Sequence, residues 1–228
     1  MSTVAVSIYL FVAVGVSYLI GSVSFAVIFS KIFANKDVRN YGSGNAGMTN
    51  VVRAVGVLPG ILTLVFDFLK GFIPCYVVGN CLFEAMLSET QSGWAQPQIF
   101  AQICGLGCML GHIFPVFFRF KGGKAVATIA GVYLACNWKV MAVAVGIFVL
   151  VFLITRTVSI GSVLAVGVCP FLMMIFYNPG CSPILQVLLV TAASALVVGK
   201  HKDNIVRILN HTEKPLSFKR TGENKCQK

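Results

Sequence analysis

Seven continuously apolar runs, separated by short polar and basic connections, constrain what this chain can fold into. The runs cover about residues 4–30, 57–79, 98–118, 125–137, 139–155, 160–177 and 183–200. The hydrocarbon core of a bilayer needs about 20 apolar residues of helix, and all but the short run 125–137 approach or exceed that length. Strands of a membrane barrel would alternate apolar and polar residues instead. The pattern therefore predicts an all-α, polytopic membrane bundle of about seven transmembrane helices.

The composition agrees with a membrane protein. Hydrophobic residues make up 57% of the chain, charged residues only 11%, and the mean hydropathy is +0.86, whereas a soluble domain carries about 25% charged residues. No basic stretch precedes the first apolar run, which therefore predicts a transmembrane helix rather than a cleaved signal peptide. We expect one integral-membrane domain over residues 1–228, with 201–228 as an amphipathic, basic cytoplasmic tail.

The basic residues predict the orientation of the chain in the membrane. The net charge is +11, which in a soluble protein could suggest nucleic acid, but in a membrane protein lysine and arginine collect in cytoplasmic loops. Apart from Lys70 and Lys139, every lysine and arginine lies in the connections 31–56, 119–124 and 156–159 or in the tail from Lys200. These segments are predicted to face the cytoplasm, which leaves the N-terminus outside and the C-terminus inside.

The most polar of these connections is residues 37–53, DVRNYGSGNAGMTNVVR. Glycines allow backbone N–H groups to converge on an anion, and an arginine after them can fork onto phosphate oxygens. We therefore interpret the segment as a phosphate-binding loop; the alternatives are a plain tight turn and, for the arginine, an anchor to lipid head groups. The residues that would bind phosphate are Ser43, Gly44, Asn45, Thr49, Asn50 and Arg53. The formal GxGxxG match is not a dinucleotide fingerprint, because no strand precedes it.

A second candidate segment lies at the start of the run 125–137. Gly122, Gly123 and Lys124 precede a predicted helix, whose free N–H groups and positive end favour an anion. The alternative is a basic cytoplasmic loop with glycines for a turn. His112, near the membrane boundary, is by residue type more often a hydrogen-bonded structural histidine than a base.

The third candidate segment follows the last apolar run. His201 and Asn204 are three residues apart, so a continuing helix would put them on one face. The alternative is an amphipathic tail with solvated charges. Ser159, in the turn after Arg156, could reach the same cavity or merely anchor the chain.

Two further patterns favour structural roles. Asp67 and Lys70 are three apart inside an apolar run, where ionisable groups usually pair; we predict an ion pair facing the bundle interior, with a catalytic Asp67 as the weaker alternative. The eight cysteines include no CxxC pair and are expected to be mostly buried hydrophobic residues, although Cys81 and Cys181 could pair. Dispersed histidines, cysteines and acids predict no metal site.

These motifs together resemble a known family. They are GS-x8-K ending at Lys31, DVRNYGSGNAGMTNVVRAVG, DFLKG, GHIFPVFFRFKGGKAVAT and HKDNIVRIL-x3-E. In this order and spacing the chain is similar to the acyl-phosphate-dependent glycerol-3-phosphate acyltransferases, integral membrane enzymes of bacteria. No HxxxxD motif, the mark of the other glycerolipid acyltransferase class, occurs.

The resemblance implies a seven-helix enzyme of the bacterial cytoplasmic membrane with its active site facing the cytoplasm. It implies transfer of a fatty acyl group from acyl phosphate to the 1-hydroxyl of glycerol-3-phosphate, giving lysophosphatidic acid and phosphate, the first step of phospholipid synthesis. Residue by residue, it implies that phosphate is held by Ser43, Arg53 and Lys124 and that the site is completed by His112, Ser159, His201 and Asn204. The expected partners are glycerol-3-phosphate, fatty acyl phosphate and membrane lipid, with no cofactor, no nucleic acid and a monomeric state.

Two questions stay open at the level of sequence. The hydroxyl proton could be taken by His201 as general base or by a substrate phosphate, in which case the histidine only positions the substrate. One rival function is a carrier for a phosphorylated metabolite; an internal repeat would favour it, but the sequence contains none. The other is a structural membrane subunit, which would not explain three glycine-rich or basic motifs on one side.

Overall fold

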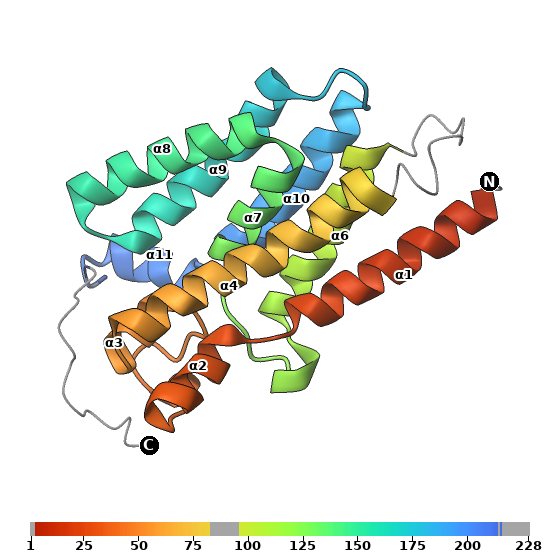
Figure 1. Cartoon of the computed structure of the whole chain (residues 1–228). Helices are drawn as coiled ribbons and strands as arrows, with labels where there is room; N and C mark the ends of the chain where they lie inside the picture. The colour runs from red at the N-terminus through yellow and green to blue at the C-terminus, as the bar shows by residue number, and fades with distance from the viewer. Residues whose placement is uncertain (1–2, 83–95, 214, 216–228) are drawn as a thin grey trace.

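The computed structural model describes residues 3–82, 96–213 and 215, and every regular element in these ranges is a helix (Figure 1). The α-helices are α1 (Thr3–Gly21), α2 (Phe25–Ala34), α3 (Met48–Ala54), α4 (Val57–Tyr76), α6 (Pro97–Ile113), α7 (Val126–Cys136), α8 (Trp138–Thr155), α9 (Val158–Phe176), α10 (Pro183–Gly199) and α11 (Lys202–Leu209). Shorter elements are the 3-10 turns η1 (Val38–Asn40) and η3 (Val116–Phe118) and the π-helical η2 (Val77–Leu82). The all-α membrane class predicted from the sequence is confirmed.

All seven apolar runs are helical, but they are not all long enough to span a bilayer. Five helical stretches in the described ranges are long and apolar enough, or six if α10 and α11, which meet at a bend of 59°, count as one span. α7 has 11 residues, and at ~1.5 Å per residue its length is about 17 Å, against about 30 Å of hydrocarbon. The expected number of about seven spans is therefore not confirmed.

The first apolar run, residues 4–30, lies within one candidate span, Val4–Ala34, but it consists of two helices, α1 and α2, with a break at residues 22–24. Ser22 Oγ donates to the carbonyl of Tyr18 (2.9 Å), and Lys70 Nζ donates to the carbonyl of Val23 (2.7 Å), which lies in the break. Lys70 Nζ lies 2.6 Å from Asp67 Oδ1 in a buried ion pair. The predicted structural pair is thus confirmed. Its lysine also provides a hydrogen bond to a backbone carbonyl that has no helical partner because the helix is broken there.

Small residues hold the short α7 against α4. A Cβ at Gly71 would lie 2.2 Å from the Thr128 carbonyl oxygen, and one at Gly131 would lie 2.1 Å from that of Phe68. Such contacts exclude a side chain and let the two backbones approach closely, as is common between membrane helices. The start of α7, next to Lys124, is therefore fixed relative to α4.

The polar connections meet at one end of the bundle. α2, α3 and α11 gather there, whereas the N-terminal end of α1 lies at the other end (Figure 1). The segments that the charge pattern places on one side of the membrane are thus also together in space. Which side of the membrane this end faces stays a prediction.

Of the two cysteines that could pair, the structure describes the side chain of one. Cys181 is a free, buried thiol whose Sγ lies 3.2 Å from Gln98 Oε1. The side chain of Cys81, its suggested partner, lies outside the described part of the chain.

Candidate active site at one end of the helical bundle

The glycine-rich segment forms a compact loop around one buried amide. Gly42 and Gly44 have φ of 59° and 70°, a left-handed conformation that favours glycine. Asn50 Nδ2 donates to the carbonyls of Val38, Tyr41 and Asn45 at 2.9–3.1 Å, and its Oδ1 accepts from the Ser43 N–H at 3.1 Å. The amide of Asn50 therefore stabilises the loop. The same side chain would have to contact phosphate in addition if the predicted phosphate-binding role is right.

Helix α3 carries the predicted phosphate arginine from this loop into the site. The helix begins at Met48, directly after the extended Gly47. Arg53 lies in its last turn, lines the cavity described below, and donates from Nη2 to the carbonyl of Pro215 at 3.1 Å.

The segment before α7 packs directly on the glycine-rich loop. A Cβ at Gly123 would lie 2.2 Å from His112 Nε2 and 2.4 Å from the carbonyl oxygen of Ala46. The Gly123 N–H also donates to the His112 carbonyl at 3.1 Å. Glycine is required here by close approach, which brings Lys124 into the same site as residues 42–53.

Lys124 is surrounded by groups of both charges. Its Nζ donates to Asn204 Oδ1. Burial lowers the pKa of Lys124 from 10.5 to about 8; the charge of Glu213 opposes this shift, and those of Arg207 and Arg53 add to it. A bound anion would favour the charged ammonium and reverse much of that shift.

A hydrogen-bond network from α11 and the segment after it closes the site. Asn204 Nδ2 donates to Ser159 Oγ (2.7 Å) and to Glu213 Oε1 (2.6 Å), and Ser159 Oγ donates to the same carboxylate oxygen (2.6 Å). Arg207 Nε pairs with Glu213 Oε2 at 2.7 Å. Burial alone would raise the pKa of Glu213, but the hydrogen bonds from Ser159, Arg207 and Asn204 lower it below 4.5. Glu213 therefore stays ionised and holds Ser159 and Asn204 in place.

His201 lies directly before α11, at the 59° bend that separates it from α10, so the last long helix does not continue unbroken to Asn204. His201 precedes α11, and its Nδ1 lies 2.8 Å from the Val197 carbonyl, so in the neutral ring Nδ1 carries the proton and Nε2 is the acceptor. Burial lowers the pKa of His201 to about 4, with the charge of Lys124 adding to the effect. Despite the bend, both residues line one cavity.

His112 lies beside the ion pair of α4. Its Nδ1 is 3.6 Å from Asp67 Oδ1, and its Nε2 lies against Gly123. Both His112 and Asp67 reach the cavity wall. The ion pair thus supports the histidine and the loop that carries Lys124.

One cavity of about 1910 Å³ brings most of the predicted site residues together. The predicted residues that line it are Ser43, Asn45, Thr49, Asn50, Arg53, His112, Lys124, Ser159, His201 and Asn204. Gly44, Gly122 and Gly123, described residues as well, lie outside its wall. Within the described ranges no group of three or more metal-ligating side chains lies together.

The cavity continues from this polar end into an apolar arm between α4, α7, α8 and α9. Its wall there includes Phe68, Phe148 and Val166. Leu64, Val65 and Val145 also line the arm, yet their side chains are 42%, 43% and 43% exposed. The arm is therefore open sideways between α4 and α8, both of which are long and apolar enough to span a bilayer.

Glu213 lines the cavity, although the sequence pattern predicted no role for it. Its signal was its place as the last residue of the motif HKDNIVRIL-x3-E, beyond the predicted helix. Its ion pair with Arg207 and its contact with Ser159, which comes from another part of the chain, could not be read from spacing.

Fold and site together define a class: helical integral membrane proteins with a basic, polar site that opens onto an apolar cavity. Comparison with known proteins identifies the family, because residues 11–211 match the family model described as glycerol-3-phosphate acyltransferase. "Glycerol-3-phosphate acyltransferase 2" of Bacillus anthracis is 42% identical over 197 residues, 86% of this chain and 94% of that protein. The glycerol-3-phosphate acyltransferase of Halalkalibacterium halodurans is 37% identical, over 90% of this chain and 94% of its own.

Solved structures agree. The crystal structure of PlsY, an integral membrane glycerol 3-phosphate acyltransferase, in its glycerol 3-phosphate form has a TM-score of 0.78 and 32% identity, covering 92% of this chain and 96% of that one. Its lysophosphatidic acid form has a TM-score of 0.76 and 31% identity, with the same coverage. The chain belongs to the glycerol-3-phosphate acyltransferase family.

Proposed function

We propose that this protein transfers a fatty acyl group from acyl phosphate to the 1-hydroxyl of glycerol-3-phosphate, giving lysophosphatidic acid and inorganic phosphate, the first step of phospholipid synthesis. The observation that carries the proposal is the shape of one cavity, whose basic end holds Ser43, Arg53 and Lys124 and whose apolar arm opens toward the bilayer. A small phosphorylated polyol fits the basic end, and a fatty chain fits the arm. The names of the relatives, and the two ligand forms of the solved neighbour, support the same substrate and product.

The proposed reaction needs no covalent intermediate with the protein, because acyl phosphate is already activated. The hydroxyl oxygen attacks the carbonyl carbon, the bond from that carbon to the phosphate oxygen breaks, and phosphate leaves with the electron pair. The site must neutralise two phosphates, align hydroxyl and carbonyl, and stabilise the developing oxyanion. Arg53 and Lys124 supply charge, and Ser43 supplies hydrogen bonds from the loop that Asn50 holds.

The hydroxyl proton has two candidate acceptors. His201 with a pKa of about 4 is neutral at pH 7 but a weak base, since catalytic bases work best with a pKa near the operating pH. This favours a substrate phosphate oxygen as acceptor, with His201 Nε2 and Asn204 orienting the substrate. If His201 is the base instead, phosphate binding near Lys124 must raise its pKa, because a neighbouring anion favours imidazolium.

We further propose that the protein lies in the bacterial cytoplasmic membrane with the site facing the cytoplasm and the N-terminus outside. The basic connections favour this orientation, and the relatives with which the chain was compared are bacterial. Glycerol-3-phosphate would reach the polar end from water, and the fatty donor would enter through the side opening.

The test is an assay of the purified protein in defined lipid vesicles with palmitoyl phosphate and glycerol-3-phosphate. We expect equal amounts of phosphate and lysophosphatidic acid, and none without glycerol-3-phosphate. Palmitoyl coenzyme A in place of palmitoyl phosphate should give no product. A protein that is folded but inactive, and that instead moves glycerol-3-phosphate across the vesicle membrane, would support the carrier alternative.

A further inference from the structure

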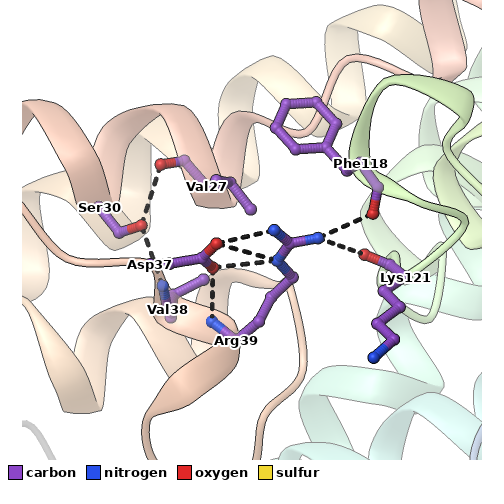
Figure 2. A network of polar contacts seen from close by, with 7 residues as sticks. All are labelled: Val27, Ser30, Asp37, Val38, Arg39, Phe118 and Lys121. Carbon is purple, nitrogen blue, oxygen red and sulfur yellow. Dashed lines mark hydrogen bonds and ion pairs between the residues drawn. The ribbon is translucent and has the colours of Figure 1, made fainter.

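Arg39 joins two segments that are about 80 residues apart in the chain (Figure 2). Its Nη1 donates to the carbonyl of Phe118 at 2.8 Å and to that of Lys121 at 3.5 Å. On its other side the guanidinium binds both oxygens of Asp37, with Nε 3.0 Å from Oδ1 and Nη2 2.7 Å from Oδ2. Figure 2 shows the guanidinium between this carboxylate and the two carbonyls.

The pair is itself anchored to the fold. Asp37 Oδ1 accepts from the Arg39 N–H at 3.0 Å, which caps η1. Ser30 Oγ accepts from the next residue's N–H, that of Val38, at 3.3 Å and donates to the Val27 carbonyl in α2 at 3.0 Å. The carboxylate is therefore a fixed point from which the guanidinium reaches across to the second segment.

The two joined segments are those that carry the candidate phosphate ligands. The carbonyl of Lys121 lies three residues before Lys124, and η1 leads directly into the loop that carries Ser43. Neither Asp37 nor Arg39 lines the cavity. The pair thus joins the two segments that carry the candidate phosphate-binding residues, but it is not placed to touch a bound molecule itself.

We propose that the Asp37–Arg39 pair is a positioning element that keeps Lys124 at the correct distance from Ser43 and Arg53, so that one phosphate can bind to all three. This inference rests on the proposed function insofar as glycerol-3-phosphate is the ligand. Arginine is required, because a planar guanidinium can donate to a carboxylate and to two carbonyls at once, whereas the compact ammonium of lysine cannot. The side chains of the pair are 23% and 22% exposed, and a partly exposed ion pair contributes little to stability. Its effect should therefore appear in ligand binding rather than in unfolding.

The first experiment compares Arg39→Lys with Arg119→Lys in the acyl phosphate assay. Arg119 is exposed, lies in the same second segment and is outside the cavity wall, so it controls for the loss of a guanidinium nearby. We expect KM for glycerol-3-phosphate to rise about tenfold in Arg39→Lys, with kcat changed less than threefold and the unfolding temperature unchanged. Arg119→Lys should match the parent. If Arg39→Lys left KM unchanged, the proposal would be overturned.

A double-mutant cycle separates positioning from simple attraction of the anion. Binding of glycerol-3-phosphate is measured by calorimetry for the parent, Arg39→Lys, Lys124→Ala and the double variant. If Arg39 acts through Lys124, its substitution weakens binding in the parent but adds no further loss once Lys124 is absent, because coupled residues are not additive. Additive losses would overturn the proposal.

Asp37→Asn serves as a second variant should Arg39→Lys fail to fold. It keeps one oxygen acceptor and removes the charge, and we expect a rise in KM of about threefold; an unchanged KM would again overturn the inference. The failure of the proposed function looks different, since it would show as a parent protein with neither binding nor acylation. A parent that acylates glycerol-3-phosphate while both variants behave normally refutes only the positioning role.

Discussion

The polar end and the apolar arm of the same cavity are built in opposite ways. At the polar end, specific contacts hold the backbone in place: the side-chain amide of Asn50 binds four backbone groups of its loop, and Gly123 lies too close to two neighbours for any side chain to fit. Along the arm, the wall consists of apolar side chains from α4, α7, α8 and α9, among them Phe68, Phe148 and Val166. Under the proposed function, this difference means that the phosphate headgroup would be recognised by fixed geometry, whereas the fatty chain would need only an apolar surface.

The largest effect expected from this comparison follows loss of charge at the polar end. Lys124→Ala and Arg53→Ala should each lower kcat/KM for glycerol-3-phosphate by roughly 100-fold, since a hydrogen bond to a charged group contributes about 1.5–3 kcal/mol. Steady-state assays in vesicles measure this, and thermal unfolding in detergent should show both variants folded. The control is Lys202→Ala, an exposed lysine of α11 outside the cavity wall, which should keep parental activity. Parental kinetics in both variants would remove the phosphate-site assignment.

An intermediate effect is expected from adding one methyl group at the polar end, with Gly146, an α8 glycine outside the cavity wall, as the control. In Gly123→Ala the new Cβ would meet the ring of His112 and the backbone of Ala46, and such overpacking costs about 1–3 kcal/mol. We expect activity to fall at least tenfold and the unfolding temperature to drop. Gly146→Ala, where space is open, should change neither. If both alanine variants kept parental activity and unfolding temperature in the same assay and unfolding scan, the close packing inferred at Gly123 would be contradicted.

The smallest effect concerns pH. Because burial lowers the pKa of Lys124 to about 8, this ammonium loses its proton mostly between pH 7 and pH 9, where an ordinary lysine is still charged. Glycerol-3-phosphate binding should therefore be lost as pH rises, with KM increasing roughly tenfold from pH 7 to pH 9, while KM for the fatty donor changes less. Lys124→Arg, whose guanidinium stays charged, should flatten the profile even if its KM is higher throughout. A parental KM that is constant up to pH 9 would contradict the lowered pKa.

Much of the molecule was predictable because its signals are local. Long apolar runs predicted the helices, and three-residue spacing predicted the Asp67–Lys70 pair. The resemblance of the motifs then named the family, which the comparisons confirm. Ten of the thirteen predicted site residues line one cavity, although their roles stay predictions.

The remainder depends on contacts that no local pattern contains. The break between α1 and α2 falls in an apolar run, and the Val23 carbonyl in that break is bound by Lys70, 47 residues away. A bend at His201 separates α10 from α11, and Glu213, beyond α11, binds Ser159 across 54 residues. Spacing arguments concern only residues that are close in sequence. They therefore predicted the candidate site residues better than the long-range contacts that position those residues.

The opening between α4 and α8 has a consequence for turnover. Under the proposed function, a lysophospholipid made with its chain in the arm would leave sideways between these helices without crossing an aqueous phase. Donor and product would then pass through the same lateral opening in one leaflet, and their effective concentrations would be their surface densities in the membrane. Release should accordingly slow as the surrounding lipid becomes cold and ordered, even where the chemical step is unaffected.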